Sequence, residues 1–143
     1  QMCIRDRDEL VAVVHTGSKL SLPDEITPED LSRIPLVLRE RGSGTLDVFE
    51  RALSEHNMKL SSLNVLLYLG STESIKLFLE HTDCIGIVSI RSISRELLSG
   101  TFRVIEIKGM PMLREFCFAQ PQGQESGLSQ VLMQFAMHHN KKL

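Results

Sequence analysis

The sequence lacks the features that mark several classes of protein. Among its 143 residues, no apolar run approaches the roughly 18 residues of a membrane-spanning helix, and the longest, at 63–69, stops at Gly70. Basic residues are not in excess, because 16 Lys and Arg oppose 18 Asp and Glu, so the basic surface of a nucleic-acid binder is absent. The amino terminus shows no apolar segment followed by a small-residue cleavage site, so no secretion signal is recognised.

Cysteine is also scarce. Cys3, Cys84 and Cys117 are an odd number without C-x-x-C spacing, which argues against a disulfide framework and against a zinc site. Cys84 and Cys117 fall within or beside apolar runs, where a free cysteine usually behaves as a small hydrophobe, so we expect both to be packed. A reducing cytoplasm fits this cysteine usage best.

Motifs for catalysis are missing as well. The segment 42–45 lacks the lysine of a P-loop, and neither a G-x-S-x-G elbow nor an H-E-x-x-H helix occurs. His138 and His139 are adjacent, so on a helix they point in different directions and are not spaced as a pair of metal ligands. We therefore expect no enzymatic activity, no metal site and no cofactor.

What is present is the composition of an ordinary globular domain. Hydrophobic residues make up 42% and charged residues 24%, and the length suits one compact core. The first residues, 1–7 (QMCIRDR), are similar to the translation of a sequencing adaptor, and we exclude them from the fold prediction. We expect the natural protein to begin further upstream.

Short apolar runs alternate with helical periodicity along the chain. Strong β-formers predict strands, and apolar residues at helical spacing between them predict helices; the last helix has the clearest pattern. This alternation predicts an α/β fold with a largely parallel sheet, beginning with a strand buried on both faces. The predicted strands are Leu10–Val14, Leu36–Leu38, Leu63–Leu69, Ile85–Val88, Phe102–Ile107 and Leu113–Phe118, and the predicted helices lie at 27–34, 46–53, 75–79, 92–99 and 128–139.

Two turns combine glycine with hydroxyls where a strand passes into a helix: Gly42-Ser43-Gly44-Thr45 and Gly70-Ser71-Thr72-Glu73. Glycine lets a ligand approach the backbone, and the unpaired amides of a helix start favour a carboxylate, sulfate or phosphate. In open α/β sheets ligands bind beyond the carboxyl ends of the strands, where both turns would lie. Ordinary helix capping by Ser and Thr explains the same residues and stays open. The adjacent charges at 39–41 either help to hold an anion or form a solvated rim.

An ordered set of segments resembles the effector-binding domain of LysR-type transcriptional regulators. The segments are 34–45 (IPLVLRERGSGT), 69–76 (LGSTESIK), 85–89 (IGIVS) and 96–100 (ELLSG). One departure is visible, because the family commonly has G-x-G-I where this chain has Cys84-Ile85-Gly86-Ile87. Loss of the first glycine puts the geometry of the preceding helix end in question.

The resemblance implies a fold like type 2 periplasmic binding proteins, of which this chain would hold one complete lobe plus the returning strand and helix of the other. Residues 8–118 would form the second lobe with its crossover strands, Leu10–His15 and Leu113–Phe118, and residues 119–143 the returning helix of the first lobe. The apolar face of Leu128–His139 would then lack most of its docking surface. Both hydroxyl turns would line the cleft between lobes, which gives an effector-contact role to Ser43, Gly44, Thr45, Ser71 and Thr72.

The implied function is sensing of a small polar or anionic effector by a cytoplasmic transcriptional regulator. DNA would be bound only through an amino-terminal helix-turn-helix that this chain lacks, and the full-length protein would form a homo-oligomer without a membrane partner. A solute-binding receptor of the same fold is the alternative, and it would require a signal peptide upstream. Neither possibility requires catalysis.

Overall fold

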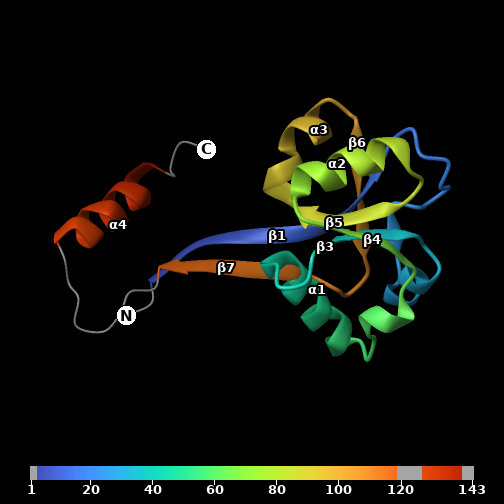
Figure 1. Cartoon of the computed structure of the whole chain (residues 1–143), viewed down its shortest axis with the longest axis horizontal. Coiled ribbons are helices and arrows are strands. Elements are labelled where there is room, and N and C mark those ends of the chain that lie inside the picture. The colour runs from blue at the N-terminus through green and yellow to red at the C-terminus, as the bar shows by residue number, and fades with distance from the viewer. Residues whose placement is uncertain (1–2, 119–126, 140–143) are drawn as a thin grey trace. The chain divides into compact units, whose positions relative to one another are not determined.

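The structure is a computed structural model that describes residues 3–118 and 127–139. Within the described residues the strands are β1 (Cys3–His15), β2 (Glu25–Ile26), β3 (Leu36–Arg39), β4 (Val65–Leu69), β5 (Ile85–Ser89), β6 (Phe102–Ile107) and β7 (Met112–Phe118). The helices are α1 (Gly44–Glu55), α2 (Thr72–His81), α3 (Ser94–Leu98) and α4 (Gly127–His139), with short 3₁₀ helices at Pro28–Ser32, Leu60–Ser62 and Ile90–Ile93. The α/β class predicted from the alternation is confirmed (Figure 1).

Contacts divide the chain into two compact units, which we describe separately. One is Asp8–Arg114, and the other combines Gln1–Arg7 with Glu115–Leu143. The boundaries predicted from the sequence, after residues 7 and 118, stay predictions.

The sheet of the larger unit is mixed rather than largely parallel. Its strand order is β2-β6-β1-β5-β3-β4, with β7 also paired to β1. Strand β3 runs parallel to β4 and β5, but β1 runs antiparallel to both β5 and β6. The apolar run Leu10–Val14 correctly indicated a strand buried on both faces, but a central antiparallel strand is buried in the same way, so the inferred direction was wrong.

Alternation along β1 separates two apolar cores, one on each face of the sheet. Helix α1 packs on one face and α2 on the other, as Figure 1 shows. The α1 core gathers Leu46, Phe49, Ala52 and Leu53 with Leu10, Ala12 and Val14, and the α2 core gathers Ile75 and Leu79 with Val11 and Val13. The two helices therefore cover opposite faces of the sheet.

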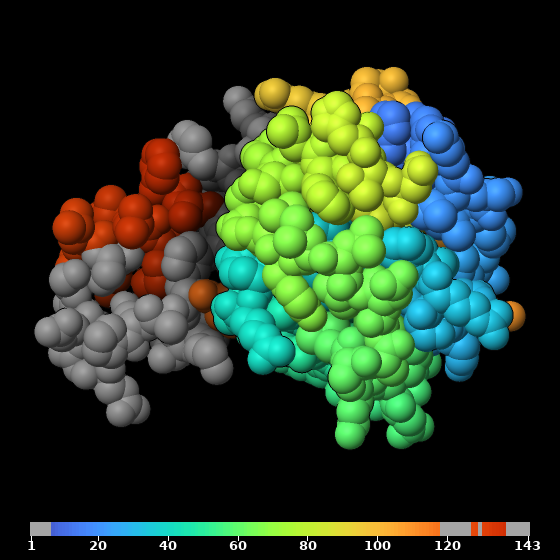
Figure 2. Space-filling view, turned by 45° about the vertical axis from the view of Figure 1, so that its right-hand side comes forward, coloured from blue at the N-terminus to red at the C-terminus, as the bar shows by residue number. Residues whose placement is uncertain are grey.

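Strand β4 forms one edge of this sheet and is shorter than the predicted strand at 63–69. Leu66, Leu67 and Tyr68 are between 39% and 46% exposed. Residues of β4 and α2, coloured green, form much of the face in view in Figure 2. The apolar run thus indicated a strand correctly, although its side chains are only partly covered.

The missing first glycine of the G-x-G-I pattern leaves the end of α2 intact. The helix ends at His81, and the next residue, Thr82, is extended with φ −140°. Cys84 is not among the described residues with positive φ, so its position does not require glycine. The second glycine is tightly packed, because a Cβ on Gly86 would lie 3.0 Å from Cγ2 of Ile75 and would require that side chain to shift.

The two described cysteine side chains differ in environment. Cys84 is fully buried in the α2 core, as expected, whereas Cys117 on β7 is exposed, so the packing predicted for Cys117 is wrong. Each lies next to an apolar residue, Ile85 or Phe116, but period-2 alternation does not show which face of a strand is covered. Burial, with a smaller contribution from Asp83, raises the pKa of the Cys84 thiol to about 11.

We expect this difference to control reactivity, since the thiolate is the reactive form. At neutral pH an alkylating reagent should modify Cys117 and leave Cys84 unmodified until the protein is unfolded. Mass mapping of labelled peptides in native buffer and in denaturant checks this. Native labelling of Cys84 at the rate of Cys117 would contradict the described burial.

In the smaller unit, α4 carries the apolar stripe that the sequence predicted. The exposed fractions of Leu128, Val131, Leu132 and Phe135 range from 58% to 81%. These side chains are mostly exposed, which is the result expected for an apolar face that lacks most of its docking surface. The side chains of His138 and His139 lie outside the described residues.

Candidate functional site

The first element of the candidate site is the passage from β3 into α1. Arg39 ends the strand, and a short turn leads to Ser43, the residue before the helix. Gly42 has a φ of +86°, a conformation that favours glycine, and this reverses the chain toward the helix start. The hydroxyl oxygen of Ser43 accepts a hydrogen bond from the backbone N–H of Leu46 at 3.2 Å.

The second element repeats this arrangement on the neighbouring strand. After β4 and Gly70, Ser71 precedes α2, and its hydroxyl oxygen accepts a hydrogen bond from the N–H of Ser74 at 3.1 Å. The capping interpretation is therefore confirmed for both serines. Each cap satisfies one amide of its helix start, and Glu73 lies in the first turn of α2.

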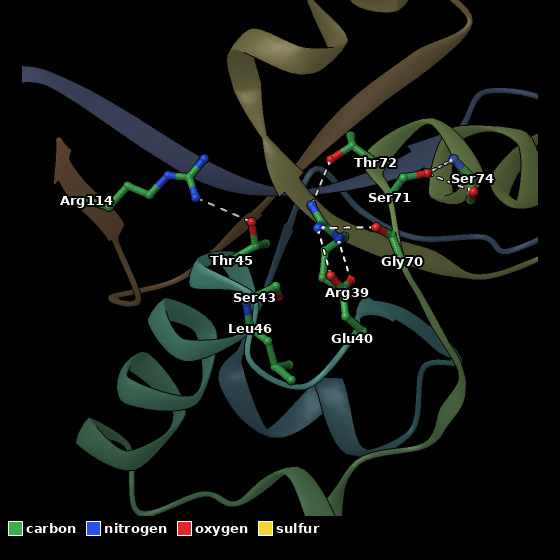
Figure 3. Close-up of polar contacts among 10 residues, drawn as sticks. All are labelled: Arg39, Glu40, Ser43, Thr45, Leu46, Gly70, Ser71, Thr72, Ser74 and Arg114. Carbon is green, nitrogen blue, oxygen red and sulfur yellow. Dashed lines mark hydrogen bonds and ion pairs between the residues drawn. The ribbon is translucent and has the colours of Figure 1, made fainter.

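The sheet brings the two helix starts to the same edge. Strands β3 and β4 are parallel neighbours, and Arg39 pairs with Leu69 in their register. The N–H of Glu40 donates to the carbonyl of Leu69 at 3.1 Å, which continues the pairing one residue beyond β3. Figure 3 shows both turns together, with Ser43 and Thr45 from one and Ser71 and Thr72 from the other.

The two threonines differ from the serines because each accepts a hydrogen bond from an arginine. Arg39 Nη1 lies 3.5 Å from Thr72 Oγ1, and Arg114 Nη1 lies 3.4 Å from Thr45 Oγ1 (Figure 3). Thr45 is 6% exposed. A Cβ on Gly44 would lie 4.0 Å from Arg114 Nη1, so Gly44 sits beside the same guanidinium.

Arg39 is held from both turns. Its Nε donates to Glu40 Oε2 at 2.9 Å and its Nη2 to Glu40 Oε1 at 3.1 Å, while Nη2 also lies 3.4 Å from the Gly70 carbonyl. The hydrogen bonds from Arg39 lower the pKa of the Glu40 carboxyl, and those same bonds raise the pKa of Arg39. Both groups are therefore ionised near neutral pH.

Arg114 is anchored by a buried carboxylate. Asp8, whose side chain is 1% exposed, accepts at Oδ2 from Nε and Nη2 of Arg114, each at 2.7 Å. Its other oxygen accepts from the hydroxyl of Ser89 at 2.7 Å. This network joins β1, β5 and β7, and through Thr45 it reaches the start of α1.

Sequence reasoning missed most of this polar network. Arg39 was singled out only as part of a charge run, and Arg114, Asp8 and Ser89 were not noticed. Two acidic residues, Asp8 and Glu9, precede the buried run at Leu10, which is a weak signal for Asp8. Nothing local marks Arg114, because its partner Asp8 is 106 residues away in the sequence.

Other features of the described residues do not compete for this role. Their His, Cys, Asp and Glu side chains form no group of three or more that could hold a metal ion. A groove of about 560 Å³ lies along β1, β6 and the turn before β7, and none of the five predicted site residues lines it. Within the same part of the chain, no helix has the length and apolar character to cross a membrane.

Comparison with known proteins identifies the family. The LysR substrate binding domain family matches residues 5–141. The chain is 30% identical over 115 residues to the RuBisCO operon transcriptional regulator of Acidithiobacillus ferrooxidans, covering 80% of this chain and 36% of that protein. It is 29% identical over 133 residues to the transcriptional activator CmpR of Synechocystis, covering 92% of this chain and 43% of the activator. The chain thus spans less than half the length of these curated relatives.

Solved structures show the same fold. The regulatory domain of CcmR from Synechocystis, in complex with 2-PG, superposes with a TM-score of 0.83 at 22% identity, covering all of this chain and 68% of that domain. The effector binding domain of QuiR in complex with shikimate gives 0.78 at 19% identity, covering 99% of this chain and 66% of that domain. The predicted fold class is confirmed. The chain belongs to the LysR substrate binding domain family.

Proposed function

We propose that this chain senses a small anionic effector at the paired starts of α1 and α2. One observation carries the proposal. Two parallel neighbouring strands place two helix starts at the same edge of the sheet, and an arginine contacts the threonine at each helix start. Amides at helix starts and guanidinium groups both favour anions. Ser43, Gly44, Thr45, Ser71 and Thr72 are the proposed contact residues, on one wall of a cleft between lobes.

Known ligands of proteins with this fold support an anion. A putative phosphate transporter substrate-binding protein from Clostridium perfringens holds phosphate, and the regulatory domain of HypT from Salmonella typhimurium holds bromide. The QuiR domain holds shikimate, which carries a carboxylate. We extend this preference to the present chain because of its arginine-contacted threonines.

We further propose that the chain acts within a cytoplasmic regulator that forms a homo-oligomer and contacts DNA through a separate domain. The names of the curated relatives, which are transcriptional regulators, support this role. The net charge of −2 supports a DNA contact outside this chain. Effector binding would then change the population of two domain arrangements.

The two threonines provide the test of the binding site. In the full-length protein, Thr45→Ala and Thr72→Ala should each weaken binding of 2-PG or shikimate by roughly tenfold, because a hydrogen bond to a charged group is lost. Thr→Ser at either position keeps the hydroxyl and should retain most of the affinity. Isothermal titration measures the dissociation constants, and chemical unfolding measures stability on the same samples.

Ser54→Ala is the matched control on α1. Its hydroxyl donates to the Glu50 carbonyl near the far end of the helix, at 2.9 Å. This variant should bind the effector as the parent does. If Thr45→Ala and Thr72→Ala lose stability but keep the parent affinity, both threonines are structural and the proposed site is wrong.

A further inference from the structure

Two arginines contact the candidate site, and their counterions differ in a way that separates their roles. Arg114 reaches Thr45 and Arg39 reaches Thr72, at 3.4 and 3.5 Å. Each guanidinium also forms an ion pair with one carboxylate, Asp8 for Arg114 and Glu40 for Arg39. An incoming anion can use a guanidinium fully only where this counterion can leave.

The counterion of Arg114 is fixed. Asp8 is 1% exposed, and all of its described hydrogen bonds are 2.7 Å long, two from Arg114 and one from Ser89. A buried carboxylate that lost its partner would keep its desolvation penalty without compensation. Arg114 is therefore a positioning residue that holds the start of α1.

The counterion of Arg39 is exchangeable. The Glu40 side chain is 43% exposed, so water can solvate its carboxylate once it moves away. Exposed ion pairs contribute little net stability, since solvent screens the charges and two long side chains lose freedom. Arg39 itself is 22% exposed and is supported from the other turn by Thr72 and the Gly70 carbonyl.

The geometry of the pair matches the mode in which arginine binds acid groups. Glu40 occupies the edge formed by Nε and Nη2, with one carboxylate oxygen on each nitrogen at 2.9 and 3.1 Å. Two parallel N–H bonds of this kind are how a guanidinium recognises carboxylate and phosphate groups. An effector with a planar or tetrahedral acid group would make the same two bonds on the same edge.

We propose that Arg39 is the cation that binds the acid group of the effector, and that Glu40 is an internal counterion that the effector displaces. This inference rests on the proposed binding of an anion at the starts of α1 and α2. It makes Arg39 a specificity-determining residue, because a neutral ligand could not replace the charge of Glu40. It also predicts that Glu40 lowers the affinity for every anionic ligand by competing for the same edge.

The experiment compares Glu40→Gln with Arg39→Gln in the full-length protein, by isothermal titration with 2-PG, shikimate and inorganic phosphate. Glu40→Gln should tighten binding by about threefold, the size expected for removing a competing exposed ion pair. Arg39→Gln should weaken binding by roughly tenfold or more, and Arg39→Lys should recover only part of this loss, because lysine keeps the charge without the two-nitrogen edge.

Glu73→Gln is the matched control for charge. Glu73 lies in the first turn of α2, is 79% exposed and pairs with Lys76 at 2.9 Å, so its replacement removes the same charge near the same helix start. If Glu73→Gln tightens binding as much as Glu40→Gln, the effect is a general electrostatic one and displacement is overturned.

The remaining outcomes separate this inference from the proposed function. If Thr72→Ala weakens binding while both Glu40→Gln and Arg39→Gln bind as the parent does, the site stands and the role of Arg39 is overturned. If the arginine and threonine variants all bind as tightly as the parent, the proposed site itself is wrong. If the parent binds none of the three probes, the anionic effector is overturned and the inference fails with it.

Discussion

Replacing Asp8 with asparagine should lower the free energy of unfolding by about 3–5 kcal/mol, the cost typical of removing one partner from a buried ion pair. The Asp8 side chain is almost completely excluded from solvent, and Arg114 is 22% exposed. In the variant, Arg114 would lose its counterion, and asparagine could accept only part of the hydrogen bonds now made by both carboxylate oxygens.

Chemical unfolding followed by circular dichroism checks this effect, and a second substitution tests its cause. If the loss comes from an unpaired charge, the double variant Asp8→Asn, Arg114→Met should recover part of the stability, because an apolar side chain needs no counterion. Asp24→Asn is the control, since Asp24 pairs with Arg103 at 3.2 Å but is 99% exposed. A loss in Asp8→Asn no larger than in this control would contradict the importance of the buried pair.

The site could be predicted from sequence only as far as local chain geometry determines it. Glycine and hydroxyl residues after an apolar strand predicted the two helix starts, and Ser43 and Ser71 do cap the starts of α1 and α2. Caps and helix starts depend on residues within one turn of each other, so one sequence contains the information. The shared edge followed from the parallel pairing of β3 and β4, which alternating strands and helices correctly indicated.

Contacts between distant segments could not be predicted in this way. The ion pair of Asp8 with Arg114 depends on the pairing of β1 with β7. Neither residue has a feature in its local sequence that identifies the other as its partner. The antiparallel direction of β1 was missed because a strand buried on both faces has the same composition in either direction. The exposure of Cys117 was missed because an apolar neighbourhood in sequence does not show which face of a strand is covered.

The contacts of Arg39 and Glu40 also required the structure. In the sequence, the charges at 39–41 fit a solvated rim as well as an anion site. The structure adds that Arg39 reaches across to Gly70 and Thr72 on the neighbouring turn, a contact that the sequence does not indicate.

Replacing Phe49 with alanine should have an effect on stability as large as that of the Asp8 variant, about 3–5 kcal/mol. Phe49 is fully buried in the core between α1 and the sheet, and it is among the largest side chains there. Removing the ring deletes apolar contacts and leaves a cavity that the surrounding strands cannot fill completely. Phe49→Leu keeps most of the volume and should lose less.

Leu98→Ala is the control for shortening an apolar side chain. Leu98 is 90% exposed, so this substitution should change the free energy of unfolding by no more than about 0.5 kcal/mol. Thermal unfolding of the three variants gives the ranking of their stabilities.

Phe49→Ala also connects packing to function, since Thr45 precedes Phe49 by four residues and lies on the same face of α1. Without the Phe49 ring, α1 packs less tightly on the sheet and Thr45 is less well positioned. Phe49→Ala should therefore also weaken effector binding at temperatures where the variant is folded. Equal losses of stability in Phe49→Ala and Leu98→Ala would contradict the position of α1 on the sheet.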